Sequence, residues 1–210
     1  MTELYYMTAD ALPADLQALC ASLSPARQAK IARARRDADK RLLLAAGLVL
    51  DRALQAHGCR EKDAAFTLGQ YGKPYLAGRV DLYFSLSHSG AVALCAVSDR
   101  ELGADVQAPR AVREELLRRV CPDAELSAFE GCFPEEKKQL FLRLWTAKES
   151  YLKCLGAGLV RDPRSFTVCK NGVLVSPEDG LYFHEYDLCG CRACVCCRDA
   201  EMPAPKEVSL

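Results

Sequence analysis

The chain has 210 residues, of which 50% are hydrophobic and 27% are charged, as in ordinary globular proteins. Its 28 basic and 28 acidic residues cancel, so bulk nucleic-acid binding is not expected and any anion site depends on local charge placement. The longest apolar stretch, residues 42–50, is too short to span a membrane. The N-terminus has no basic segment followed by an apolar one, so we expect a cytoplasmic protein without a secretory signal.

The first predicted helix is strongly basic. Ser24 and Pro25 are typical of the N-cap and the first residue of a helix, which we expect to run towards Gly58. Residues 24–41 carry seven lysines and arginines against two aspartates, a local charge of +5. Two interpretations stay open for this face: a solvated basic surface, or a binding surface for a polyanionic ligand.

The elements that follow are strands and helices in alternation. Buried strands are predicted at 80–84, 91–97 and 102–106, with a tight turn between the first two. Helices are predicted at 110–120, at 123–129 and from Pro134 to a stop at Gly156. Short strands are predicted at 165–169, 173–175, 181–187 and 193–197, with a hairpin turn at Asn171-Gly172. Helices followed by strands therefore occur twice, with a join near Gly103.

The long helix contains the most informative stretch, WTAKESYLK at residues 145–153. Trp145, Glu149 and Lys153 are four residues apart and so share one face of the helix. Glu149 and Lys153 could form only a surface ion pair. The single tryptophan of the chain on the same face indicates partial burial instead, and a buried carboxylate needs a partner such as a metal ion or a lysine.

A second informative stretch is LGADVQ at residues 102–107. Alternation along a strand places Asp105 and Gln107 on the same side. Two oxygen-bearing side chains at the end of a strand suit a hard divalent cation such as Mg²⁺. The alternative is an aspartate that only caps a turn.

A third informative region combines Gly72-Lys73-Pro74 with the sequence FSLSHSG at residues 84–90. Lys73 could bring a point charge to a phosphate, and Pro74 stiffens the loop. Ser87 and His88 offer a hydroxyl and an imidazole. A serine hydrolase is not expected, because adjacent residues seldom form a nucleophile–base pair and no G-x-S-x-G motif is present.

Taken together in this order, the basic helix with Arg41, GKP, F-x-x-SHSG, G-x-D-x-Q and W-T-x-KE-S-x-x-K resemble the 4′-phosphopantetheinyl transferases of the surfactin-synthetase-activating type. The resemblance covers residues 24–168. It implies an α+β fold of two similar α/β lobes related by a pseudo-twofold axis, each with helices on a small antiparallel sheet. The lobes would be residues 1–102 and residues 103–210, the second with the metal site and the catalytic helix.

The resemblance also implies an activity and the residues for it. The 4′-phosphopantetheine arm of coenzyme A would be transferred to a serine of an apo carrier protein, with Mg²⁺ as cofactor and a monomer as the active form. Glu149 and Lys153 would be catalytic, and Asp105, Glu149 and Gln107 would hold the metal. The residues matching coenzyme A positions are Arg41, Lys73, Ser87, His88, Asp105, Glu149 and Lys153, and Arg27 and Lys30 lie where the family has further basic residues.

One position departs from the family pattern, since Gln107 replaces an acidic residue. An amide offers an oxygen without a charge, so a bridging water could take the place of direct ligation. The rival function is a non-catalytic coenzyme A or carrier-protein binding module, and the presence of both Asp105 and Glu149 argues against it.

The chain also holds twelve cysteines, five of them within residues 189–197. In a cytoplasmic protein these thiols stay reduced. The cluster is either a metal site or a terminal strand with alternate cysteines facing the core; the spacing favours the strand, because only one zinc knuckle is present.

Overall fold

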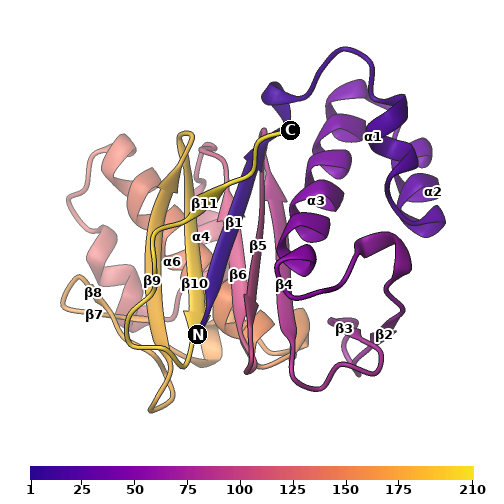
Figure 1. Cartoon of the computed structure of the whole chain (residues 1–210). Helices are drawn as coiled ribbons and strands as arrows, with labels where there is room; N and C mark the ends of the chain where they lie inside the picture. Colours follow the sequence, from indigo (N-terminus) through magenta and orange to yellow (C-terminus); the bar gives the residue numbers. More distant parts are fainter.

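The computed structural model describes residues 1–210, apart from the side chain of Leu159. It is an α+β structure of two halves, each with helices on a small antiparallel sheet, which confirms the predicted fold class (Figure 1). Each half contains, in order, a strand, a long helix, a small hairpin and two long strands. In both main sheets the first strand of the half pairs with its last long strand. The last long strand also pairs with the strand that precedes it in the sequence. The two halves therefore share one topology.

The first half is built on the sheet order β11-β1-β5-β4. Its strands are β1 (Glu3–Thr8), β2 (Phe66–Leu68), β3 (Pro74–Leu76), β4 (Tyr83–Ser89) and β5 (Val92–Ser98). Its α-helices are α1 (Gln17–Ala21), α2 (Pro25–Arg33) and α3 (Asp37–Gln55), and 3₁₀ turns occupy Ala9–Ala11 and Glu61–Asp63.

The second half is built on the sheet order β6-β10-β9. Its strands are β6 (Gly103–Gln107), β7 (Cys169–Lys170), β8 (Val173–Leu174), β9 (Tyr182–Leu188) and β10 (Cys191–Cys197). Its α-helices are α4 (Glu114–Val120), α5 (Asp123–Leu126) and α6 (Pro134–Cys154), and 3₁₀ turns occupy Ser127–Phe129, Gly158–Val160 and Pro163–Ser165. The last strand, β11 (Lys206–Glu207), returns to pair in parallel with β1.

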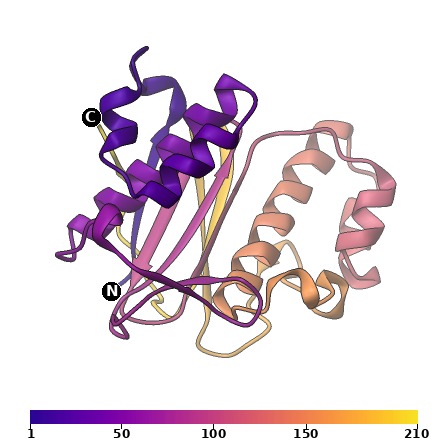
Figure 2. The same cartoon turned by 90° about the vertical axis from the view of Figure 1, so that its right-hand side faces the viewer.

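The two sheets lie together in the middle of the molecule, with α3 outside one sheet and α6 outside the other (Figures 1 and 2). Alternation along the strands explains these layers. On β5, Ala93, Cys95 and Val97 belong to the core under α3, whereas Val92, Leu94 and Ala96 belong to the core between the sheets. On β10, Cys194 and Cys196 face the core under α6. The face of each sheet that points away from its long helix therefore packs against the other sheet.

The basic helix differs from the prediction of one continuous helix. Ser24 caps α2 as expected, accepting the Arg27 N–H, but α2 ends at Arg33 and α3 begins at Asp37. Aspartates in the first turn of α3 are favourable there because the N-terminal end of a helix carries partial positive charge. The break lets Ile31 of α2 reach the core.

The strand predictions around the tight turn are also revised. Strand β4 continues through Ser87 and His88, and the turn comes only at Gly90, whose φ of +60° suits glycine. Strand β1 was outside the sequence predictions, and residues 163–165 form a 3₁₀ turn where a strand was expected to begin. The hairpin at Asn171-Gly172 is confirmed, with φ angles of 53° and 76°.

The long helix is confirmed, from Pro134 to Cys154, with the Glu136 carboxylate accepting the Phe133 N–H at its start. Among the described residues, no helix is long and apolar enough to cross a membrane. We keep the division into residues 1–102 and 103–210 as a proposal, with β11 of the second lobe added to the sheet of the first.

Candidate active site

The carboxylate of Asp105 lies on β6 and is almost fully buried, with 3% of the residue exposed. Its Oδ1 accepts hydrogen bonds from Lys153 Nζ at 2.6 Å and Ser87 Oγ at 2.8 Å, and its Oδ2 accepts one from Gln107 Nε2 at 3.0 Å. Three donors, one each from α6, β4 and β6, therefore hold the Asp105 carboxylate in one orientation. Such a group is ordered enough to bind a cation in a defined place.

Glu149, on α6, is a second carboxylate facing the same place. Burial raises its pKa, the negative charge of Asp105 raises it further, and Lys153 opposes both effects. Its Oε1 is buried and has no hydrogen-bond partner among the described residues. A buried carboxylate without a donor is stabilised either by protonation or by a bound cation. Asp105, Glu149 and Gln107 together offer the oxygen ligands that Mg²⁺ prefers, so these residues fit the metal that the sequence suggested.

A glycine brings the helix and the strand together. A Cβ added to Gly103 on β6 would lie 1.9 Å from the Ser150 backbone oxygen and 2.4 Å from the Cys154 nitrogen. Glycine therefore lets α6 rest directly on β6. This contact places Glu149 and Lys153 beside Asp105, and Lys153 Nζ also donates to the Ala104 oxygen at 3.0 Å.

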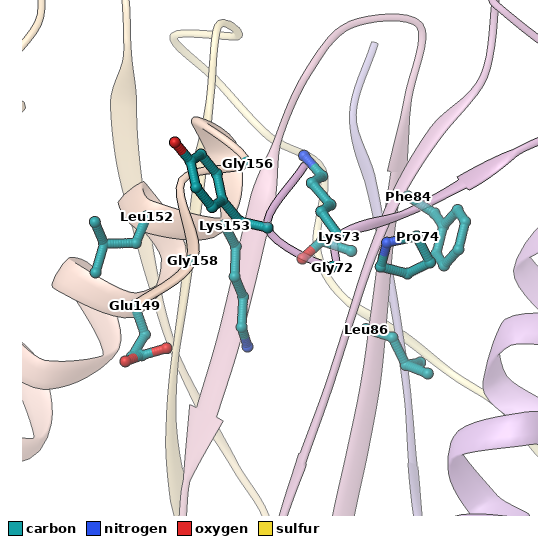
Figure 3. Close-up of a pocket in the computed structure, with 12 residues that line it drawn as sticks. Gly72, Lys73, Pro74, Phe84, Leu86, Glu149, Leu152, Lys153, Gly156 and Gly158 are labelled. Carbon is teal, nitrogen blue, oxygen red and sulfur yellow. The ribbon is translucent and has the colours of Figure 1, made fainter. Parts of the chain in front are cut away.

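Glu149 and Lys153 line a pocket of about 250 Å³ between the two halves (Figure 3). The opposite wall consists of Lys73, Pro74, Phe84 and Leu86 from the first half. Lys73 is not free there, because its ammonium donates to Glu101 and to the Leu102 carbonyl oxygen. Its ion pair ties the β2–β3 turn to the segment that leads into β6.

A second pocket, of about 280 Å³, shares Pro74, Phe84 and Leu86 with the first. Its remaining lining includes Arg27, Lys30 and His88. Burial lowers the pKa of His88, and the positive charges of Lys30, Lys153 and Arg27 lower it further. Because the two pockets share these residues, they form one groove, with Glu149 and Lys153 beside Asp105 at one end and Arg27 and Lys30 at the other. Such a groove suits a polyanion with a bound divalent cation.

The structure separates Ser87 from His88. They are consecutive residues of a strand, so their side chains point to opposite faces. Ser87 contacts Asp105, whereas His88 lines the basic pocket. This arrangement offers no serine–histidine pair for a hydrolase.

Arg41 is not brought together with the other site residues. Its guanidinium donates to the backbone oxygens of Ala9, Leu12 and Pro13, and it lines neither pocket of the groove. Those bonds attach α3 to the segment after β1. Gln107, in contrast, does lie at the site, because its amide nitrogen donates a hydrogen bond to the carboxylate of Asp105.

Sequence reasoning missed two charged partners. Glu101 holds Lys73, and no spacing rule links residues so far apart. Lys148 belongs to the quoted motif, but its role was not assigned: its ammonium is fully buried, 3.0 Å from Glu125, and it donates to the backbone oxygens of Pro163 and Phe166. The sequence did contain a signal for burial of Lys148, because this lysine shares a helix face with Trp145 and Leu152.

The cysteine cluster lies largely on β10, confirming the strand interpretation of its backbone. Cys194 and Cys196 face α6, while Cys191 and Cys197 face the core between the sheets. Cysteines on opposite faces of one strand cannot converge on one ion. All twelve cysteines are free, and within the described part of the chain no three His, Cys, Asp or Glu side chains are grouped to hold a metal.

Comparison with known proteins agrees with this geometry. The family model of the 4′-phosphopantetheinyl transferase superfamily matches residues 101–185. The chain is 32% identical over 165 residues to the 4′-phosphopantetheinyl transferase HetI of Nostoc sp., which covers 75% of this chain and 70% of the relative. It is 31% identical over 150 residues to the 4′-phosphopantetheinyl transferase Sfp of Bacillus subtilis, covering 70% of this chain.

A further 4′-phosphopantetheinyl transferase of Bacillus subtilis is 31% identical over 128 residues, which is 61% of this chain. The matches span 57% and 66% of the lengths of the two Bacillus subtilis relatives, less than two thirds of each.

Proposed function

The chain belongs to the 4′-phosphopantetheinyl transferase superfamily, and from this premise we propose that it transfers the 4′-phosphopantetheine arm of coenzyme A to a serine of an apo acyl or peptidyl carrier protein. In this reaction the serine oxygen bonds to the phosphorus that carries pantetheine. The bridging P–O bond of the diphosphate breaks, and adenosine 3′,5′-bisphosphate leaves. The observation that carries the proposal is the groove, with Glu149 beside Asp105 at one end and Arg27 and Lys30 at the other.

Asp105 and Glu149 would hold Mg²⁺, which when bound neutralises charge on the diphosphate. Gln107 would support the carboxylate of Asp105. Transfer of a phosphoryl group depends mainly on positioning and on charge neutralisation, and both come here from groups that the fold has already ordered.

Glu149 is the proposed base for the serine hydroxyl. Burial and the neighbouring Asp105 raise its pKa, which makes the carboxylate a better proton acceptor near neutral pH. Lys153, one helical turn further, carries a positive charge beside the same carboxylates and would stabilise the negative charge that develops on the leaving group.

The phosphates of the nucleotide end would bind at the other end of the groove. Arg27 and Lys30 supply positive charge there, and the imidazole of His88 would donate a hydrogen bond to the 3′-phosphate. The rings of Pro74 and Phe84 supply apolar surface between the two ends. Lys73, already paired with Glu101, would hold the loop that forms this wall. Because one chain provides both ends of the groove, we infer that the active form is a monomer.

The test is incubation with coenzyme A, Mg²⁺ and several apo carrier proteins, followed by intact-mass spectrometry. We expect each accepted carrier to gain one phosphopantetheinyl group. A carrier whose attachment serine is replaced by alanine, and a reaction with a chelator, are the controls and should show no gain. Binding of coenzyme A without any adduct on any carrier would favour the non-catalytic binding module instead.

A further inference from the structure

Three serines of β4 face β6 at alternate positions. Each hydroxyl accepts a backbone N–H of the segment 104–108: Ala104 bonds to Ser85 at 2.9 Å, Val106 to Ser87 at 3.3 Å and Ala108 to Ser89 at 3.0 Å. Donor and acceptor advance together by two residues, so the two strands run in the same direction. We call this set the serine ladder.

The serine ladder joins the two halves at the edges of their sheets. β4 is the last strand of one main sheet and β6 is the first strand of the other. An edge strand presents N–H groups that need acceptors when they are buried. Side-chain hydroxyls supply those acceptors here, so the ladder sets the register of β6, and with it the position of Asp105, relative to the first half.

The middle serine differs from the other two in having a carboxylate partner. Ser87 Oγ also donates its single proton to Asp105 Oδ1 at 2.8 Å, and the residue is buried. A hydroxyl has one proton to donate, so the proton of Ser87 is committed to the carboxylate. Ser89 accepts from the backbone in the same way but has no carboxylate partner within the described part of the chain.

We propose that Ser87 is a positioning residue for Asp105, and not a ligand of coenzyme A. It orients the carboxylate so that the oxygens of Asp105 and Glu149 face the same cation. Hydrogen-bond partners behind a metal ligand typically contribute about 10–100-fold to metal affinity or activity. The kinetic part of this proposal rests on the proposed function, whereas the metal-binding part does not.

The experiment compares Ser87→Ala with Ser89→Ala, a matched change that removes a rung of the ladder without a carboxylate contact. Binding of Mn²⁺ is followed by electron paramagnetic resonance, and kcat and KM for coenzyme A are measured on an accepted carrier. For Ser87→Ala we expect Mn²⁺ affinity and kcat to fall about tenfold or more, with KM for coenzyme A within about twofold. Ser87→Thr keeps the hydroxyl, so its Mn²⁺ affinity and kcat should both lie within about threefold of the wild-type values.

Two results would overturn the proposal. A rise in KM for coenzyme A with kcat and Mn²⁺ affinity retained would make Ser87 a ligand contact. Equal effects of Ser87→Ala and Ser89→Ala on Mn²⁺ affinity, after thermal melting has confirmed that both variants fold, would make Ser87 only a rung of the ladder. If the wild-type protein binds Mn²⁺ but modifies no carrier, the proposed function fails while the Mn²⁺ comparison still decides the role of Ser87.

Discussion

The long helices α3 and α6 occupy equivalent places in the two halves but bury different chemistry. The buried face of α3 is apolar apart from Asp51, near its end. The buried face of α6 includes Thr146, Lys148 and Ser150, all without exposed surface. Buried polar groups persist only where partners satisfy them, and each partner set restricts the sequence. One topology therefore accommodates an apolar helix face in one half and a polar one in the other, and we propose that this difference separates a binding half from a reactive half.

The side chains that line the groove also differ between the two halves. The first half lines it with Arg27 and Lys30, which carry positive charge, and with His88, and the second half lines it with Glu149, which lies beside Asp105. If this division is functional, changes in the second half should act mainly on kcat or metal dependence, and changes in the first half mainly on KM for coenzyme A.

Glu149→Gln should have the largest effect. It removes a negative charge from the cation site and the proposed base, so kcat should fall about a hundredfold or more. Burial raises the pKa of Glu149 because it disfavours the ionised form, so loss of this charge should not lower the thermal midpoint. Turnover is measured by mass spectrometry of the carrier. Retention of more than about a tenth of wild-type turnover, or about 1.4 kcal/mol, would remove Glu149 from the mechanism.

Lys148→Met tests the buried polar face of α6 through stability. It leaves the Glu125 carboxylate buried without its ammonium partner, which typically costs about 3–5 kcal/mol. Urea unfolding measures the loss. The control is Lys138→Met, which breaks the more exposed Lys138–Glu135 pair on the same helix and should change stability little. Similar unfolding midpoints for the two variants would show that the buried pair does not hold α6 in place.

His88→Ala tests the first half. Loss of a charge-assisted bond to the 3′-phosphate should raise KM for coenzyme A about tenfold and leave kcat within about twofold. Dephospho-coenzyme A, which lacks that phosphate, is the control substrate and should be used equally well by both proteins. Equal losses with both substrates would place His88 away from the 3′-phosphate.

Gln107→Glu should have the smallest effect and sharpens the description of the second half. It adds a negative charge beside Asp105, so the Mg²⁺ concentration for half-maximal rate should fall about threefold, because affinity rises with the number of charged ligands. Gln107→Ala should change this Mg²⁺ concentration less. Rate is measured against Mg²⁺ at saturating coenzyme A. Superimposable curves for all three proteins would mean that residue 107 does not face the metal, and a large loss for the alanine variant would make the amide a direct ligand.

Local signals in the sequence determined several parts of this structure. Pro134 and Gly156 bound the long helix, Ser24 and Pro25 begin the basic one, and Asn171-Gly172 forms the hairpin turn. Glu149 and Lys153 share a helix face because four residues make about one turn. The order of the motifs also identified the family. These features depend on neighbours within a few residues, which a sequence displays directly.

Contacts between distant residues were decided only by the tertiary structure. The break between α2 and α3 follows from how each helix meets the core, and β4 extends through His88 because its backbone pairs with β5 as far as Ser89. Arg41 bonds to backbone oxygens near residue 10, Lys73 pairs with Glu101, and Ser87 with Asp105. Each of these partners lies at least 18 residues away in the chain. A hydrogen bond or ion pair over such a separation has no periodic signature in the sequence, since it forms only when packing brings the two groups together.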